Sequence, residues 1–268
     1  YVSPSVWAYR EKRIYKIKKS VDLMLTLFPF ETAIYQQHGI AVKCVGHPLA
    51  DSIGFEDQKQ LHRQKYDLAA DDAVVALMPG SRGGEIKRLG PIFLAAAIES
   101  LRDYPQLRFL IPFSSAEAKI RINALLKASN IFPSEQFQLV DDSHAAISAA
   151  DLVVLASGTA TLETLLLRRP MIVGYKLASL TYAIASRLVK IPYVALPNLL
   201  AGRPLVPEYI QHNLTATGLR DEIMKFMQDV KAHEPLLEEF DAIHHSLRLD
   251  ASKQAAAAIA ALLEGDKH

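Results

Sequence analysis

The stretch Val74 to Glu85, VVALMPGSRGGE, decides the fold of this 268-residue chain. An apolar run from Val74 to Met78 predicts a buried parallel strand, and PGSRGG breaks that strand before a helix that begins near Glu85. Glycines in such a turn let a ligand approach the backbone, and the following helix directs free N–H groups at it. The pattern favours a phosphate or diphosphate held by Gly80, Ser81, Arg82 and Gly83, with the forked cation of Arg82 adding permanent charge. Because the turn is neither GxGxxG nor a P-loop, a purely steric need for glycine remains an alternative.

A second stretch, DLVVLASGTATLE from Asp151 to Glu163, has the same design. A buried strand ends at Ala156, and the turn Ser157, Gly158, Thr159, Ala160, Thr161 offers N–H groups and hydroxyls to an anion at a helix start. Glu163 either caps that helix or accepts hydrogen bonds from a ribose diol. Ligands of parallel sheets bind at the carboxyl ends of strands, so we expect the two turns to face one crevice.

The rest of the chain alternates between apolar runs and helical patterns. Further strands are predicted at 107–113, 137–140, 152–155, 171–175 and 193–196, with helices at 92–101, 116–129, 144–149, 161–167 and 180–188. A β-α-β unit is predicted at 22–45, and helices at 9–19, 217–231, 234–249 and 250–263. This alternation predicts an α/β fold, Rossmann-like, with a parallel sheet covered by helices on both faces. The chain becomes polar and charged from Asp51 to about Leu68, which places a domain boundary between about Gly46 and Asp57. We therefore expect domains at 1–50 and 51–249, followed by a C-terminal helix at 250–268.

Composition excludes several functions. Thirty Lys and Arg against 29 Asp and Glu give a net charge of +1, which makes no case for a nucleic-acid partner. The single cysteine, Cys44, allows neither an internal disulfide nor a cysteine-based zinc site. No apolar run is long enough to cross a membrane and no signal-peptide pattern opens the sequence, so we expect a cytoplasmic protein. The basic segment 9–19 favours contact with anionic lipid or phosphorylated substrates, with a solvated helix face as the alternative.

Other polar residues give weaker signals. Asn198 lies in the apolar segment 191–204, where it either caps a turn or donates to a sugar or phosphate. His47 is expected to be structural, the Asp141–Asp142 pair to cap a helix, and His244 and His245 to lie on a helix surface. No catalytic-triad spacing, HExxH motif or DxD pair occurs, so the sequence predicts no metal site.

Six segments resemble the lipid-A-disaccharide synthase family and follow its order. They are SPSVWAYR at 3–10, VGHPLAD at 45–51, MPGSRGGE at 78–85, ASGTATLE at 156–163, MIVGYK at 171–176 and LVKIPYVALPNLLAGR at 188–203. The resemblance implies GT-B architecture, with two Rossmann-like domains and the nucleotide between them. It also implies an inverting transfer from UDP-2,3-diacylglucosamine to 2,3-diacylglucosamine 1-phosphate, which makes the β-1,6 disaccharide of lipid A. No cofactor or metal is implied, whereas a peripheral position at the inner membrane surface and a possible homodimer are.

The same resemblance assigns the donor side of the reaction to this chain. It implies that Arg82 binds the diphosphate, the Ser157–Thr161 turn binds phosphates and Glu163 binds the ribose, with Arg82 and Asn198 supporting catalysis. Residues 1–50 resemble only the end of the family's N-terminal domain, so we expect an N-terminal truncation and assign no catalytic base. The alternatives are a non-catalytic UDP-binding fragment and another GT-B enzyme that uses UDP-N-acetylglucosamine. SPSVWAYR and PNLLAGR argue against the latter enzyme.

Overall fold

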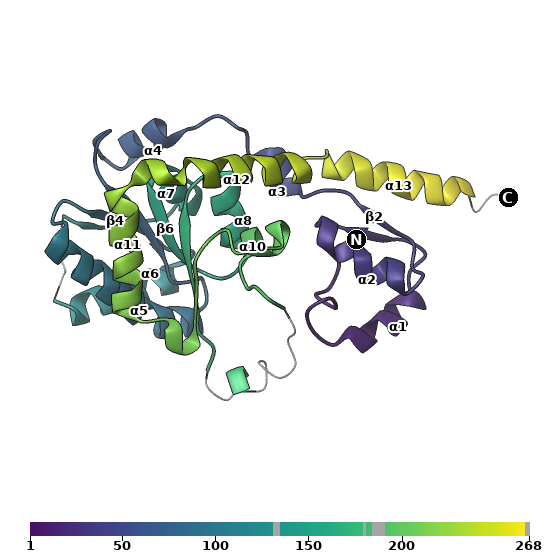
Figure 1. Ribbon diagram of the computed structural model, residues 1–268, viewed down its shortest axis with the longest axis horizontal. Coiled ribbons are helices and arrows are strands. Elements are labelled where there is room, and N and C mark those ends of the chain that lie inside the picture. The colour runs from purple at the N-terminus through teal and green to yellow at the C-terminus, as the bar shows by residue number, and fades with distance from the viewer. Residues whose placement is uncertain (131–134, 179–180, 184–190, 266–268) are drawn as a thin grey trace.

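The computed structural model of the protein describes residues 1–130, 135–178, 181–183 and 191–265. A small N-terminal unit and a large α/β unit lie side by side in Figure 1, and the C-terminal helix extends from the large unit over the small one. None of the helices in these ranges has the length and apolar character needed to cross a membrane.

The large unit is built on a six-stranded parallel sheet, as the sequence predicted. Its strands in spatial order are β5 (Phe137–Val140), β4 (Arg108–Pro112), β3 (Val74–Met78), β6 (Leu152–Ala156), β7 (Met171–Tyr175) and β8 (Glu208–Ile210). Strand β8 escaped prediction because three half-buried residues at a sheet edge give no apolar run. The strand predicted at 193–196 is wrong, since Leu196 already begins a helix with Pro197 in its first turn.

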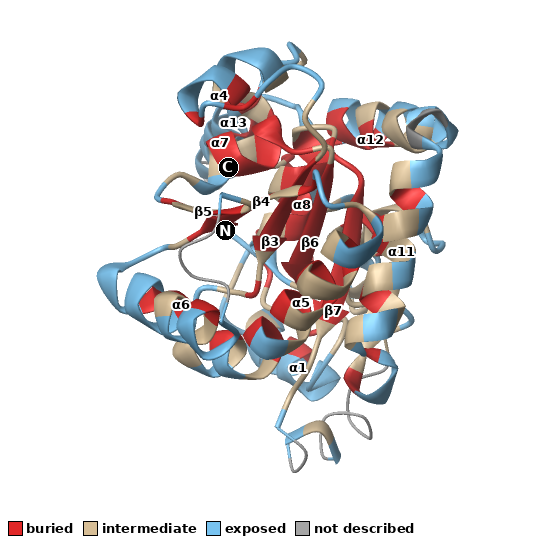
Figure 2. Ribbon diagram, turned by 90° about the vertical axis from the view of Figure 1, so that its left-hand side faces the viewer, coloured by how far each residue is buried: buried red, intermediate tan, exposed pale blue. Residues whose placement is uncertain are grey.

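Helices cover both faces of this sheet. In β3, Val74 and Ala76 pack into one apolar cluster and Val75 and Leu77 into the other, because successive side chains of a strand point to opposite faces. Figure 2 shows the buried strands β3, β6 and β7 enclosed by helices. The two layers consist of α5 (Gly83–Asp103), α6 (Ala116–Ala128) and α11 (Ala216–Gln228), and of α7 (Ser143–Ala149), α8 (Thr159–Leu166), α10 (Leu196–Ala201) and α12 (Glu234–Leu247). Most of the helix predicted at 180–188 lies outside the described residues.

The N-terminal unit contains the predicted β-α-β arrangement. Strands β1 (Met24–Thr26) and β2 (Val42–Cys44) pair in parallel, and η2 (Pro29–Glu31) and α2 (Thr32–Gln37) connect them. The helix predicted at 9–19 is shorter, with η1 (Glu11–Arg13) and α1 (Ile14–Lys18), because Arg10 adopts a left-handed backbone at φ 55°. The core of the unit is Val6, Ile14, Met24, Tyr35 and Ile40.

The end of the chain ties the two units together. The carboxylate of Asp51, at the end of α3 (Pro48–Ser52), accepts hydrogen bonds from the N–H groups of Asp250 and Ala251 at the start of α13 (Ala251–Gly265). Ala258 of α13 then packs in one cluster with Leu25 and Val45 of the small unit. The expected division at residue 50 therefore stays a prediction, and α13 belongs by its contacts to both units.

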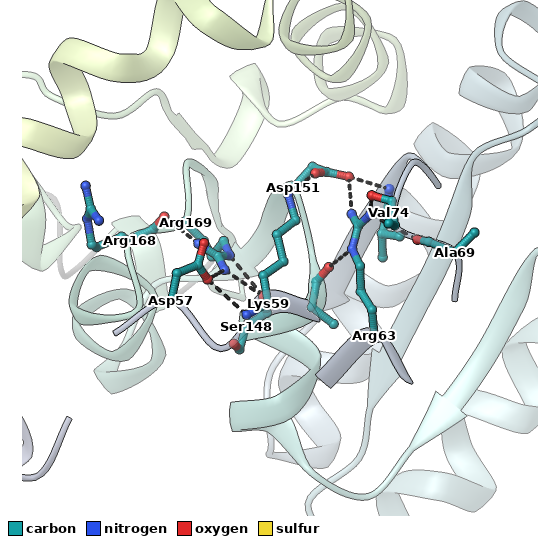
Figure 3. A network of polar contacts seen from close by, with 11 residues as sticks. Asp57, Lys59, Arg63, Ala69, Val74, Ser148, Asp151, Arg168 and Arg169 are labelled. Atoms are coloured by element: carbon teal, nitrogen blue, oxygen red, sulfur yellow. Dashed lines mark hydrogen bonds and ion pairs between the residues drawn. The ribbon is translucent and has the colours of Figure 1, made fainter. Parts of the chain in front are cut away.

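A buried arginine fixes the starting ends of the two central strands. Arg63 of α4 (Lys59–Lys65) is 1% exposed and donates to the carbonyls of Ala69, Ala70 and Ala149. Its guanidinium also pairs with Asp151, 2.9 Å away, and that carboxylate accepts the N–H of Val74 at 2.8 Å (Figure 3). The network joins the residues at the start of β3 and β6.

Candidate functional site

The strand order places the two predicted turns at the topological switch point of the sheet. From β3 the chain continues outward to β4 and β5, then returns to β6 on the other side of β3. In parallel α/β sheets, this is the place where ligands bind. A cavity of about 420 Å³ lies here, and the expectation that both turns face one crevice is confirmed. Of the predicted site residues, those lining it are Gly80, Ser81, Arg82, Ser157, Gly158, Thr159, Ala160 and Glu163.

The first turn is held in shape by Glu85. Gly80 has φ +107°, and a Cβ there would lie 2.4 Å from the Glu85 carboxylate, so only glycine fits. The same carboxylate pairs with Arg82 at 3.0 Å. The Arg82 side chain is 83% exposed, so this pair is weak and leaves the guanidinium available to a ligand. Gly83 lies outside the cavity, in a neighbouring hollow beside Arg121. As the first residue of α5, it has an N–H group without a partner inside the helix.

The sequence predicted that the hydroxyls of the second turn bind an anion, but two of them are bonded within the protein. The Ser157 hydroxyl donates to the carbonyl of Val194 at 2.6 Å, and the buried Thr161 hydroxyl donates to the carbonyl of Gly158 at 2.7 Å. Neither is free for an anion, and Thr161 does not line the cavity. What the turn offers is the exposed Thr159 and the N–H groups of the first turn of α8. A Cβ added at Gly158 would meet nothing within 4 Å, so the backbone is open to close approach there.

Glu163 lies on the wall of the cavity and has a histidine neighbour, His144. His144 Nδ1 of α7 is 3.2 Å from Glu163 Oε1, and this hydrogen bond raises the pKa of His144 above its usual value against the opposing effect of burial. The pair holds the carboxylate at one side of the cavity. The predicted ribose contact of Glu163 stays a prediction.

Asn198 does not lie in the cavity, and the structure favours its turn-capping alternative. The residue is 1% exposed. Its amide group donates to the carbonyl of Val206 and to the carboxylate of Glu208, and it accepts the N–H groups of Leu205 and Val206. These four hydrogen bonds use both N–H donors of the amide, so none is left for a sugar or phosphate. The expected donation from Asn198 to the substrate is therefore corrected.

Several residues of the cavity were missed by sequence reasoning. They are Met78, Glu85, Pro112, Phe113, Ser114, Asp141, Ser143 and Ala156. Phe113, Ser114, Asp141 and Ser143 follow the carboxyl ends of β4 and β5, so the strand-end rule applied to every predicted strand would have found them. Asp142, as expected, caps α7 by accepting the N–H of Ala145.

A second cavity, of about 530 Å³, has a different character. It lies beside the linker 52–58 and the last residues of α7 and α8. Arg169 in its wall is already bonded to the Asp57 carboxylate and to the carbonyl of Ser148 (Figure 3). Arg168 pairs with Asp241. Two of the three arginines that line this cavity are thus paired with acidic side chains, and the third, Arg248, lies over the ring of Phe55, so the first cavity is the better anion site. Among the described residues, no three His, Cys, Asp or Glu side chains come together as a metal site.

Comparison with known proteins gives concordant results. A family model described as lipid-A-disaccharide synthetase matches residues 1–261. The chain is 50% identical over 265 residues to the lipid-A-disaccharide synthase of Pseudomonas aeruginosa, covering 98% of this chain and 68% of that protein. It is 49% identical to the synthase of Pseudomonas syringae pathovar tomato, with the same coverage.

Solved structures resemble this one in fold. WaaG, a glycosyltransferase involved in lipopolysaccharide biosynthesis, superposes with a TM-score of 0.52 at 14% identity, over 88% of this chain and 61% of WaaG. The Staphylococcus aureus MnaA–UDP co-structure gives 0.58 at 13% identity, over 91% and 60%. At these identities the likeness concerns the fold alone.

Proposed function

Since the chain belongs to the lipid-A-disaccharide synthase family of GT-B glycosyltransferases, we propose that it supplies the donor side of a lipid A hexosyltransferase. The reaction joins UDP-2,3-diacylglucosamine and 2,3-diacylglucosamine 1-phosphate into the β-1,6 disaccharide 1-phosphate and releases UDP. One observation carries the assignment of the site: two anion-accepting turns line a single cavity at the switch point of the sheet.

The proposed chemistry at this cavity is leaving-group stabilisation. The acceptor 6-hydroxyl oxygen attacks C1 of the donor sugar and loses its proton to a base, while the bond from C1 to the UDP oxygen breaks and its electrons remain on UDP. In this proposal Arg82 and the N–H groups at the start of α8, whose residues Thr159 and Ala160 line the cavity, meet that growing charge. We propose that they do so without a metal or cofactor. The base is expected in the part of the relatives' length that this chain does not match, because the chain covers 68% of the Pseudomonas aeruginosa synthase.

The proposal extends to the cellular setting. Both substrates carry acyl chains, and the small unit exposes the basic side chains of Arg10, Lys12, Arg13 and Lys16 beside the 61%-exposed Tyr15. This surface supports peripheral contact with the cytoplasmic face of the inner membrane. The exposed apolar residues of α13, Ile259 and Leu263, support association with a second copy.

A radiolabelled-acceptor assay tests this proposal. The chain of 268 residues is expected to bind UDP but to form no disaccharide, whereas a chain extended by the N-terminal part of a relative is expected to form it. General-base catalysis and joint positioning of two substrates together contribute more than about 10²- to 10⁴-fold, so their loss leaves no detectable product. Turnover by the short chain would place the base inside it. Failure of both chains to bind UDP would contradict the donor assignment.

A further inference from the structure

Glu208 connects the edge strand β8 to the segment that precedes α10. Its carboxylate accepts the N–H of Val194 at 3.0 Å and the N–H of Ala195 at 2.9 Å. It also accepts the side-chain amide of Asn198 at 2.8 Å. Three donors on one carboxylate fix the backbone of 194–198 against β8.

The opposite side of this segment contacts the second anion-accepting turn. The carbonyl of Val194 accepts the hydroxyl of Ser157, and the N–H of Leu196 donates to the Thr161 hydroxyl at 3.4 Å. Val194 is therefore bonded to Glu208 through its N–H and to Ser157 through its carbonyl. Ser157 lines the cavity, whereas neither Glu208 nor Asn198 does.

We propose that Glu208 is a positioning residue for the diphosphate subsite, acting through Val194 on the Ser157–Ala160 turn. Asn198 assists it by binding the carboxylate from the side and by closing the loop onto Leu205 and Val206. The inference rests on the proposed function, because it assigns the turn to the phosphates of UDP.

Calorimetric titration of the chain with UDP, inorganic pyrophosphate and uridine tests the proposal. Glu208→Gln removes the negative charge and places an NH₂ group opposite the N–H of Val194, the donor to Oε2, so the link from Glu208 to Val194 and the turn is weakened. Affinity for UDP and for pyrophosphate is expected to fall by the same factor, about tenfold, as expected for the loss of one charge-assisted hydrogen bond. Affinity for uridine is expected not to change, because uridine has no phosphate. Asp72→Asn is the matched control: Asp72 accepts the N–H of Ala69 next to the start of β3, at the other end of the sheet.

A double-mutant cycle with Ser157→Ala separates this role from a general contribution to stability. Because the effect passes through the bond between Ser157 and Val194, Glu208→Gln is expected to have little further effect in the Ser157→Ala chain. Additive losses, or unchanged phosphate affinity in Glu208→Gln with only a lower melting temperature, would overturn the proposal. Glu208→Asp, which keeps the charge but shortens the side chain, replaces Glu208→Gln if that variant does not fold. If the unmodified chain binds neither UDP nor pyrophosphate, the proposed function itself fails.

Discussion

Arg82 is the residue on which the leaving-group assignment depends most. We predict that Arg82→Ala weakens UDP binding by about 1.5 to 3 kcal/mol, the range for a hydrogen bond to a charged group. Arg121→Ala is the control, because Arg121 is also a surface arginine near Gly83 but pairs with Glu117 outside the cavity. Calorimetry on the three chains decides the matter. Equal UDP affinity in all of them would remove Arg82 from the site.

Glu163 can be tested by comparing two ligands. Only UDP carries a ribose, so Glu163→Gln is expected to weaken UDP more than pyrophosphate, by roughly the 1 kcal/mol that a net hydrogen bond contributes. The measurement is the ratio of the two dissociation constants in wild type and variant. Identical losses for the two ligands would show that Glu163 has only a structural role beside His144.

At the residue scale, the sequence predicted the two turns but not the orientation of every side chain in them. Glycines and a strand-to-helix boundary are local signals, so Gly80, Arg82 and Gly158 were found. The hydrogen-bond partners of Ser157 and Asn198 come from other segments, at Val194 and Glu208, whereas the Thr161 hydroxyl bonds to Gly158 within its own turn. No local pattern distinguishes a hydroxyl that is bonded to a remote carbonyl from one that is free for a ligand.

At the element scale, the start of the sheet depends on the ion pair of Arg63 and Asp151. We predict that Asp151→Ala lowers the free energy of unfolding by about 3 to 5 kcal/mol, because it leaves a guanidinium that is 1% exposed without its counter-charge. Lys65→Ala, which breaks an exposed pair with Asp142, should cost less than about 1 kcal/mol. Denaturant titration measures both. Similar small losses would mean that the carbonyls around Arg63 compensate its charge.

The strands themselves were the most predictable elements. The runs at 74–78, 152–155 and 171–175 are apolar and are buried on both faces of the sheet, so composition alone identifies them. The segment 193–196 has the same apolar character, but its N–H groups go to Glu208 and not to a neighbouring strand. Tertiary hydrogen bonding overrides local preference there.

At the scale of the whole molecule, His244 joins α12 to α3, the helix that follows the small unit, and we expect this contact to be sensitive to pH. The sequence placed it on a helix surface, yet it is fully buried and its Nε2 donates to the carbonyl of Ala50 at 2.9 Å. Burial lowers its pKa below 6.5, with Arg248 and His245 adding to the effect and the Ala50 carbonyl and Asp241 opposing it. The folded state therefore favours neutral His244. The contribution of His244 to the free energy of unfolding is fully present above the unfolded pKa of about 6.5. It is lost as the pH falls below that value, with a slope of at most about 1.4 kcal/mol per pH unit.

We predict that His244→Gln makes the decrease in stability between about pH 7 and pH 5 shallower than in wild type, although it lowers stability at pH 7. His212→Gln is the control: His212 is an exposed histidine, whereas the groups that shift the pKa of His244 are Ala50, Arg248, His245 and Asp241, so the pH profile should not change. Urea unfolding at a series of pH values gives the slopes. Parallel profiles for wild type and His244→Gln would exclude His244 as the source of acid sensitivity.

The central claim is that the donor diphosphate binds at the switch point of the sheet, and a crystal structure of the chain with UDP tests it most directly. The account predicts the diphosphate in the 420 Å³ cavity, within hydrogen-bonding distance of Arg82 and of the N–H groups at the start of α8, with the ribose at Glu163. UDP bound instead in the 530 Å³ cavity beside Arg168 and Arg248 would contradict it.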